Sequence, residues 1–135
     1  VTRESRSTIR SIYDPCERVR VYELHGDLLF AGAEQVLRTV ERESGDFDVA
    51  IMEVSRIDDI NDASRGMLAG MRSTLTAAGK EGFLVDPDNA VVQPASQEGY
   101  DAIVFHTLDD AVIAAQEFRL SDQMRDGAAD VGDVG

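Results

Sequence analysis

Residues 19–34 read VRVYELHGDLLFAGAE, and the spacing of the apolar residues changes within this stretch. Apolar and polar residues alternate over residues 19–24, which predicts a half-buried β-strand. Residues 25–27 are typical of a turn, and the apolar residues 28–30 predict a short second strand paired with the first. From residue 31 to 43 the apolar residues recur at helical spacing, which predicts a helix.

The next segments continue the alternation of strand and helix patterns. Residues 47–54 read FDVAIMEV and predict a strand that is buried on both faces. A polar loop is expected over residues 55–64. A second helix is expected over residues 63–78, with Gly79 just beyond its end.

Two short apolar runs, residues 82–85 and 103–105, predict the remaining strands, and a loop is expected over most of residues 86–99. Thr107 is expected to cap a last helix that ends near residue 120. This order of elements predicts an α/β (α+β) fold, a mixed β-sheet of about five strands with helices packed on it.

The two ends of the chain lack such patterns. Residues 1–18 are polar, and we expect a linker or the end of an upstream domain. Residues 19–120 are expected to form the domain itself. Residues 121–135 are rich in Asp and Gly, which predicts an acidic flexible tail.

The charge of the chain is strongly negative, with 26 acidic against 13 basic residues and a formal net charge of −13 at pH 7. Lys80 is the only lysine. Such a charge repels nucleic acid and anionic membranes, so neither is expected as a partner. The single cysteine, Cys16, fits a reducing compartment such as the cytoplasm. Because there are also only two histidines, we expect no metal and no other cofactor.

The sequence lacks the motifs of a hydrolase. It contains no Gly-x-Ser-x-Gly, and no Ser-x-x-Lys exists because Ala77 stands three residues before Lys80. We therefore expect this chain to have no catalytic activity of its own.

In their order and spacing, these segments resemble a STAS domain, the fold shared by anti-anti-sigma factors and the cytoplasmic tails of sulfate transporters. The resemblance is carried by the strand that ends in LHGDL, the buried strand, the loop and helix before Gly79, the strand after it, and a closing acidic helix start. These segments are residues 24–28, 49–54, 60–78, 83–85 and 105–111.

Residues 25–34, HGDLLFAGAE, resemble more narrowly the STAS domain fused to the C-terminus of some bacterial glutaminases. Those enzymes hydrolyse glutamine with a serine-dependent catalytic domain of β-lactamase-like fold, which would lie upstream of this chain. The resemblance implies a non-catalytic regulatory and protein-interaction module.

The resemblance also indicates where regulation would act. The Asp-Ser-Ser-Gly motif of anti-sigma antagonists, which carries a phosphorylated serine, falls on residues 61–64. Asn61 takes the acidic position, Asp62 the phospho-acceptor position and Ser64 the glycine position. Either Asp62 locks the switch in an acidic state, or the loop has lost its switch and kept the fold.

Neighbouring residues allow more than one interpretation. Ser64 is either a helix cap or a free hydroxyl. Asp58, Asp59 and Asp62 are either solvated loop charges or ligands of a divalent cation, although no calcium-loop pattern is present. Residues on the following helix are candidates for a partner surface, and its methionines suit a core equally well. These are Arg65, Met67, Met71 and Arg72.

Three functions remain open. The first is a regulatory module that contacts a protein partner or an upstream enzyme domain. The second is an acidic module that keeps a fused enzyme soluble in high salt. The third is a free-standing anti-anti-sigma-like regulator, against which the missing acceptor serine argues. A homodimer is also left open.

Overall fold

The computed structural model describes residues 8–91 and 102–134. For residues 125–134 it describes the backbone alone. One five-stranded sheet has the strand order β1-β2-β3-β4-β5, in which β1 is antiparallel to β2 and all other pairs are parallel. The predicted fold class is confirmed. The elements are β1 (Ile9–Cys16), β2 (Val19–Leu28), α1 (Phe30–Arg42), the short 3-10 helix η2 (Ser44–Asp46), β3 (Val49–Ile60), α2 (Asp62–Ala69), α3 (Met71–Ala77), β4 (Glu81–Val85), β5 (Val104–Phe105) and α4 (Leu108–Val134).

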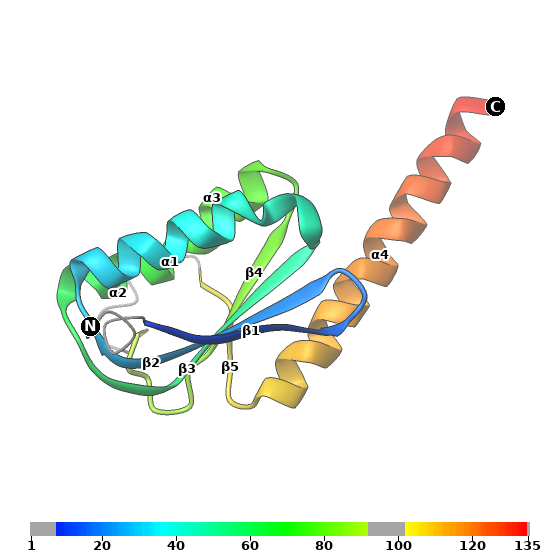
Figure 1. Ribbon diagram of the computed structural model, residues 1–135. Helices are drawn as coiled ribbons and strands as arrows, with labels where there is room; N and C mark the ends of the chain where they lie inside the picture. Colours follow the sequence, from blue (N-terminus) through cyan, green and yellow to red (C-terminus); the bar gives the residue numbers. More distant parts are fainter. Residues whose placement is uncertain (1–7, 92–101, 135) are drawn as a thin grey trace.

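Helices cover both faces of the sheet, as Figure 1 shows, with α1, α2 and α3 on one face and α4 on the other. Two parallel strands must be joined by a crossover connection, because the chain has to return across one face of the sheet before the next strand can begin. The larger core cluster includes Leu24, Met52 and Leu68 beneath the first three helices. A smaller cluster, which includes Val21, Ile51 and Ala115, lies between the sheet and α4.

The first hairpin differs from the one expected. Residues 28–30 do not form a second strand, since β2 continues to Leu28 and α1 begins at Phe30. Gly26 has a φ of +76° inside β2, where the register with β3 shifts, so the expected turn is an irregularity within a single strand. The partner of β2 in the hairpin is β1, and Arg18 makes the connection with a φ of +61°.

Strand β1 lies within the segment that we expected to be a linker. Ile9–Cys16 forms the edge of the sheet, and most of its side chains are exposed. An exposed edge strand buries too little apolar surface to produce an alternating pattern, so no periodicity marked this strand. The folded unit therefore begins before residue 19. The presence of an upstream domain stays a prediction.

Two further boundaries differ from expectation. Strand β3 runs to Ile60, so most of the expected polar loop is the exposed end of a strand paired with β2. The expected single helix over residues 63–78 is divided at Gly70, which ends α2 and precedes α3. Glycine weakens helix interiors, and here it marks the break.

The last helix begins as expected and ends later. The Oγ1 atom of Thr107 accepts a hydrogen bond from the backbone N–H of Asp110 at 3.1 Å, as a helix cap does. Helix α4 then runs to Val134, through the segment expected to be a flexible tail, and its second half extends away from the sheet (Figure 1). The loop expected over residues 86–99 lies largely outside the described residues. No helix in the described part of the chain has the length and apolar character needed to cross a bilayer.

Candidate functional site

The candidate site lies where β3 ends and α2 begins. Asn61 is the N-cap residue of α2, and its side-chain oxygen accepts a hydrogen bond from the backbone N–H of Ser64 at 2.9 Å. This bond satisfies one of the amide groups that every helix start leaves without a partner. The capping role expected of Ser64 therefore belongs to Asn61, and α2 begins at Asp62, one residue before the expected start.

Asp62 is the most accessible charge of the site. Its side chain is fully exposed, at 100%, and its Oδ1 atom lies 2.6 Å from Nη1 of Arg65. Arg65 also donates from Nε to the backbone oxygen of Ala90 at 2.9 Å, which joins α2 to the segment after β4. The phospho-acceptor position of the motif thus presents a carboxylate to solvent beside an anchored arginine.

Ser64 cannot present a reactive hydroxyl in this structure. The residue is completely buried. Its Oγ is the one buried side-chain oxygen or nitrogen among the described residues for which no hydrogen-bond partner is found. A kinase needs an accessible hydroxyl, so Ser64 is poorly placed for phosphorylation.

The other two carboxylates do not converge with Asp62. Asp58 and Asp59 are exposed on the end of β3, and Oδ1 of Asp59 accepts from the backbone N–H of Ile60 at 2.9 Å. Within residues 8–91 and 102–134, no three His, Cys, Asp or Glu side chains gather in a group that could hold a metal ion. The arrangement is that of solvated strand-end charges.

The expected partner surface on the second helix is only partly available. Met71 is 3% exposed and belongs to the core, while Met67 is partly buried against the same cluster. Arg72 donates from Nε to Oε1 of Glu81 at 2.6 Å, so its charge is used within the domain. Of the four candidates, Arg65 remains beside Asp62 at the surface, and Met71 and Arg72 have structural roles instead.

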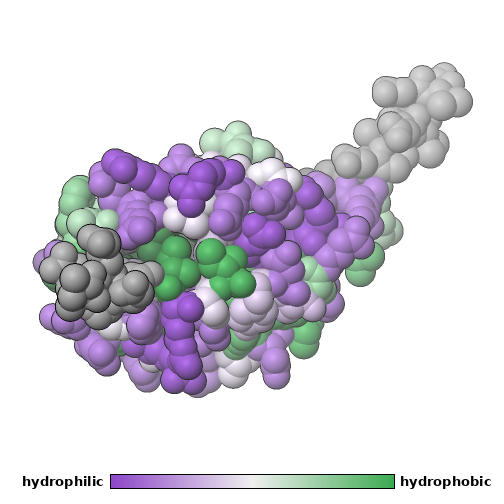
Figure 2. Space-filling view, viewed as in Figure 1, coloured by the Kyte–Doolittle hydropathy of each residue, from purple (hydrophilic) through white to green (hydrophobic). Residues whose placement is uncertain are grey.

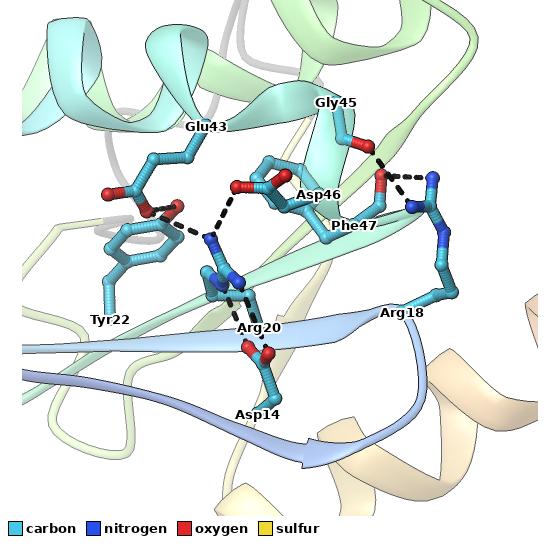
Figure 3. A network of polar contacts seen from close by, with 8 residues as sticks. All are labelled: Asp14, Arg18, Arg20, Tyr22, Glu43, Gly45, Asp46 and Phe47. Carbon is cyan, nitrogen blue, oxygen red and sulfur yellow. Dashed lines mark hydrogen bonds and ion pairs between the residues drawn. The ribbon is translucent and has the colours of Figure 1, made fainter.

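A second polar cluster, which the sequence did not indicate, lies at the opposite end of β2 and is drawn in Figure 3. Arg20 contacts Asp14 at 2.7 Å, and Glu43 and Asp46 at 3.3 Å each. The hydroxyl of Tyr22 donates to Glu43 at 2.7 Å. Burial and this neighbouring carboxylate raise the pKa of Tyr22, so the hydroxyl remains protonated and keeps donating. The cluster ties β1, β2 and the end of α1 together.

A third cluster joins α4 to the sheet through Asp48. Its Oδ1 atom lies 3.0 Å from Nη2 of Arg18 and 3.7 Å from Nζ of Lys80, and its Oδ2 atom lies 3.1 Å from Nε of Arg119. The hydrogen bond from Arg18 lowers the pKa of Asp48; Arg119 and Lys80 act in the same direction, against the effect of partial burial. The pairs span up to 71 residues in sequence, which explains why no local pattern indicated them.

We expect Asp48→Asn to lower the free energy of unfolding at pH 7 by about 1–2 kcal/mol, since it weakens three ion pairs at once. A carboxylate whose pKa falls on folding stabilises the fold above its unfolded value of about 3.9, and this stability is lost as the pH falls through the lower folded value. Below about pH 4, urea unfolding should therefore depend less steeply on pH in the variant than in the wild type.

The control for this prediction is Asp46→Asn, which removes a charge from a side chain that is 66% exposed and makes one contact, with Arg20. It should cost less than about 0.5 kcal/mol. Equal losses in the two variants, or parallel pH profiles of wild type and Asp48→Asn, would contradict the stabilising role of Asp48.

Comparison with solved structures identifies this architecture. SpoIIAA, an anti-sigma factor antagonist, matches with a TM-score of 0.58 at 16% identity, over 77% of this chain and 94% of SpoIIAA. The murine anion transporter Slc26a9 matches with a TM-score of 0.62 at 23% identity, over 77% of this chain and 18% of the transporter. The domain thus belongs to the class of mixed-sheet α/β modules that occur both alone and within larger proteins. It has the STAS fold, and the predicted resemblance is confirmed.

The protein Mglu matches with a TM-score of 0.55 at 25% identity, over 60% of this chain and 20% of Mglu. The chain therefore spans about a fifth of the length of that relative. Mglu has also been solved in an L-glutamate-binding form in the presence of 4.3 M NaCl, a structure that matches with a TM-score of 0.53 at 17% identity. No family model matches the sequence, and no curated protein does.

Proposed function

We propose that this chain is a non-catalytic STAS module of the cytoplasm, and that it serves as the C-terminal domain of a bacterial glutaminase. The observation that carries the proposal is the similarity to Mglu, which reaches 25% identity over 60% of the chain. L-glutamate, which Mglu binds in one structure, is the product expected when glutamine is hydrolysed. The catalytic serine and lysine would lie in an upstream domain, since this chain has no Ser-x-x-Lys.

The surface at the start of α2 is the contact site that we propose for the enzyme domain or for another protein. Asp62 offers it an exposed carboxylate, held beside Arg65 on a helix whose start is fixed by Asn61. A carboxylate carries its charge at all times at neutral pH, whereas a phosphoserine is made and removed. The contact would therefore be constitutive, and its partner surface would be cationic.

The proposal is tested first by the size of the protein in the cell. An antibody raised against residues 19–120 is used to blot a lysate of the native cell, prepared with protease inhibitors. A band several times larger than 14.7 kDa, together with glutaminase activity in the immunoprecipitate, is the expected result. A band at 14.7 kDa would overturn the glutaminase assignment and leave a free-standing STAS protein.

Charge reversal tests the contact site. The enzyme domain of the longer polypeptide is titrated with this chain by calorimetry, and Asp62→Arg is expected to raise the Kd at least tenfold, because like charges would then oppose each other across the interface. Asp110→Arg is the matched control, since Asp110 is also an acidic residue in the first turn of an exposed helix start. An unchanged Kd for Asp62→Arg, or an equal rise for both variants, would exclude the start of α2 as the contact.

A role in salt tolerance is the second candidate. The net charge of −13 and the structure of Mglu in 4.3 M NaCl support it. An acidic module of this kind should become more stable as NaCl rises toward molar concentrations and should show no saturable partner. Urea unfolding in 0.1 M and 3 M NaCl, combined with the titration above, separates the two functions. The free-standing regulator is the weakest candidate, because Asp62 replaces the acceptor serine and Ser64 is buried.

A further inference from the structure

The outer edge of strand β1 is the most conspicuous unused backbone surface of the domain. The strand is eight residues long and lies at the end of the sheet, with β2 as its neighbour. No strand of residues 8–91 or 102–134 pairs with its other edge. An open edge is a template for another strand, unless charges or irregularities protect it. The register of β1 with β2 shifts between Ile9 and Ser11 and between Tyr13 and Cys16, so the regular part of this edge is the short stretch between the two irregularities.

The sequence of β1 is complementary to itself. When two copies pair antiparallel with Ile12 opposite Ile12, Arg10 of each copy lies opposite Asp14 of the other. Ser11 then lies opposite Tyr13. Opposite charges and apolar residues in such cross-strand positions stabilise a sheet, and like charges destabilise it. This one register therefore matches both the charges and the apolar residue.

Neighbouring registers lose this match. A shift by one pair in one direction sets Ile12 against Arg10, and in the other direction it sets Ile12 against Asp14. Registers in which the two-fold axis lies between residues set Ile12 against Ser11 or Tyr13, and none of them brings Arg10 opposite Asp14. The Pro15 ring, which lacks an N–H, confines the pairing to residues 10–14.

The side chains in question are accessible. Ile12 is 40% and Tyr13 37% exposed, which is high for large apolar residues. Arg10 is exposed and makes no ion pair with any residue that the structure describes. The carboxylate of Asp14 receives Nε and Nη2 of Arg20 at 2.7 and 3.1 Å, while its side chain stays 49% exposed. A carboxylate has about four acceptor positions, so a second arginine can still bind.

The surface around β1 is consistent with pairing to a second copy. Figure 2, viewed as in Figure 1, shows a small hydrophobic area between the line of β1 and helix α1, within a face that is otherwise mostly hydrophilic. The register of β1 with β2 sets Ile12 beside Tyr22, which belongs to the core beneath α1. In a pair of copies, each Ile12 would extend that apolar layer across the axis.

We propose that this chain forms a symmetric dimer in which two β1 strands pair antiparallel about a two-fold axis through Ile12, so that the two five-stranded sheets become one continuous sheet. A two-fold interface of this kind uses the same residues on both copies and closes without further growth. It is independent of the surface at the start of α2, so either proposal can fail without the other.

Disulfide trapping tests the register directly. In a Cys16→Ser background, Ile12→Cys brings two cysteines to directly opposed positions, where Cα atoms are about 4.5–5.5 Å apart and a disulfide can form. Glu17→Cys, in the same background, is the exposed control. Its two copies would be ten residues apart along the strands, on the order of 30 Å. Mild oxidation should give a covalent dimer for Ile12→Cys alone; dimers with both variants or with neither would overturn the proposal.

The oligomeric state supplies the second measurement. Sedimentation equilibrium of the wild type in 0.15 M NaCl should give a mass twice the 14.7 kDa of the chain. Arg10→Asp should raise the dimer Kd at least tenfold, since it sets two pairs of carboxylates against each other. Arg56→Asp, which makes the same charge change on an exposed position of β3, should change the Kd less than twofold. A monomeric wild type, or equal effects of the two variants, would overturn the proposal.

Discussion

Replacing Glu81 by alanine should lower the free energy of unfolding by about 3 kcal/mol, the lower end of the range for breaking a buried ion pair. The side chain of Glu81 is 8% exposed at the start of β4, and its carboxylate receives Nε and Nη2 of Arg72 at 2.6 and 3.2 Å. The same carboxylate accepts the backbone N–H of Gly82 at 2.9 Å. Its loss leaves a partly buried guanidinium without this partner and a buried amide without its acceptor.

The control is a salt bridge of the same chemistry at the surface. Glu34 and Arg38 are one helical turn apart on α1, and their side chains are 44% and 71% exposed. Glu34→Ala should cost less than about 0.5 kcal/mol. Urea unfolding followed by circular dichroism measures both variants, and comparable losses would show that the pair between α3 and β4 contributes no more than an exposed one.

Phe47→Ala should have a similar or larger effect, a loss of about 3–5 kcal/mol, because it removes a large side chain from a packed core. Phe47 is completely buried, and its ring meets that of Tyr22 edge-on, with the ring centres 6.4 Å apart. It lies between η2 and β3, so the cavity would open where the end of α1 meets the sheet.

Phe30→Ala is the matched control for Phe47→Ala. Phe30 is 53% exposed at the start of α1, so truncation removes few contacts and should cost less than about 1 kcal/mol. The same urea titration compares the two phenylalanines. A loss below 1 kcal/mol for Phe47→Ala would mean that the core collapses around the deleted ring, and the packing described for this end of the sheet would be wrong.

The parts of the fold that could be predicted from sequence are those in which burial imposes a period. The alternation in β2 and the apolar run of β3 marked the central strands, and the helical spacing of α1 marked the first crossover. Strand β1 gave no such signal because it is an exposed edge. The end of β3 could not be predicted for the same reason, since Asp58 and Asp59 are polar residues on a strand that is exposed there.

Asn61, Asp62 and Ser64 lie at the start of α2 and Asp58 and Asp59 on the end of β3, and their part in function stays a prediction. A cap at Asn61 is consistent with its residue type, and α2 begins one residue before the start expected at residue 63. The burial of Ser64 depends on how α2 packs on the sheet, which no local pattern records. The clusters around Arg20 and Asp48 join residues distant in sequence, and only the folded chain brings their charges together.

The cluster around Asp48 has a consequence for chemical labelling. Lys80 is the only lysine of the chain, its side chain is 19% exposed, and it contacts Asp48 together with Arg18 and Arg119. These 135 residues therefore carry a single side-chain amine, and that amine lies where α4 meets the sheet. Whether an acylating reagent modifies this amine shows whether α4 is in contact with the sheet at Asp48. The reagent leaves the arginines that make this contact unmodified.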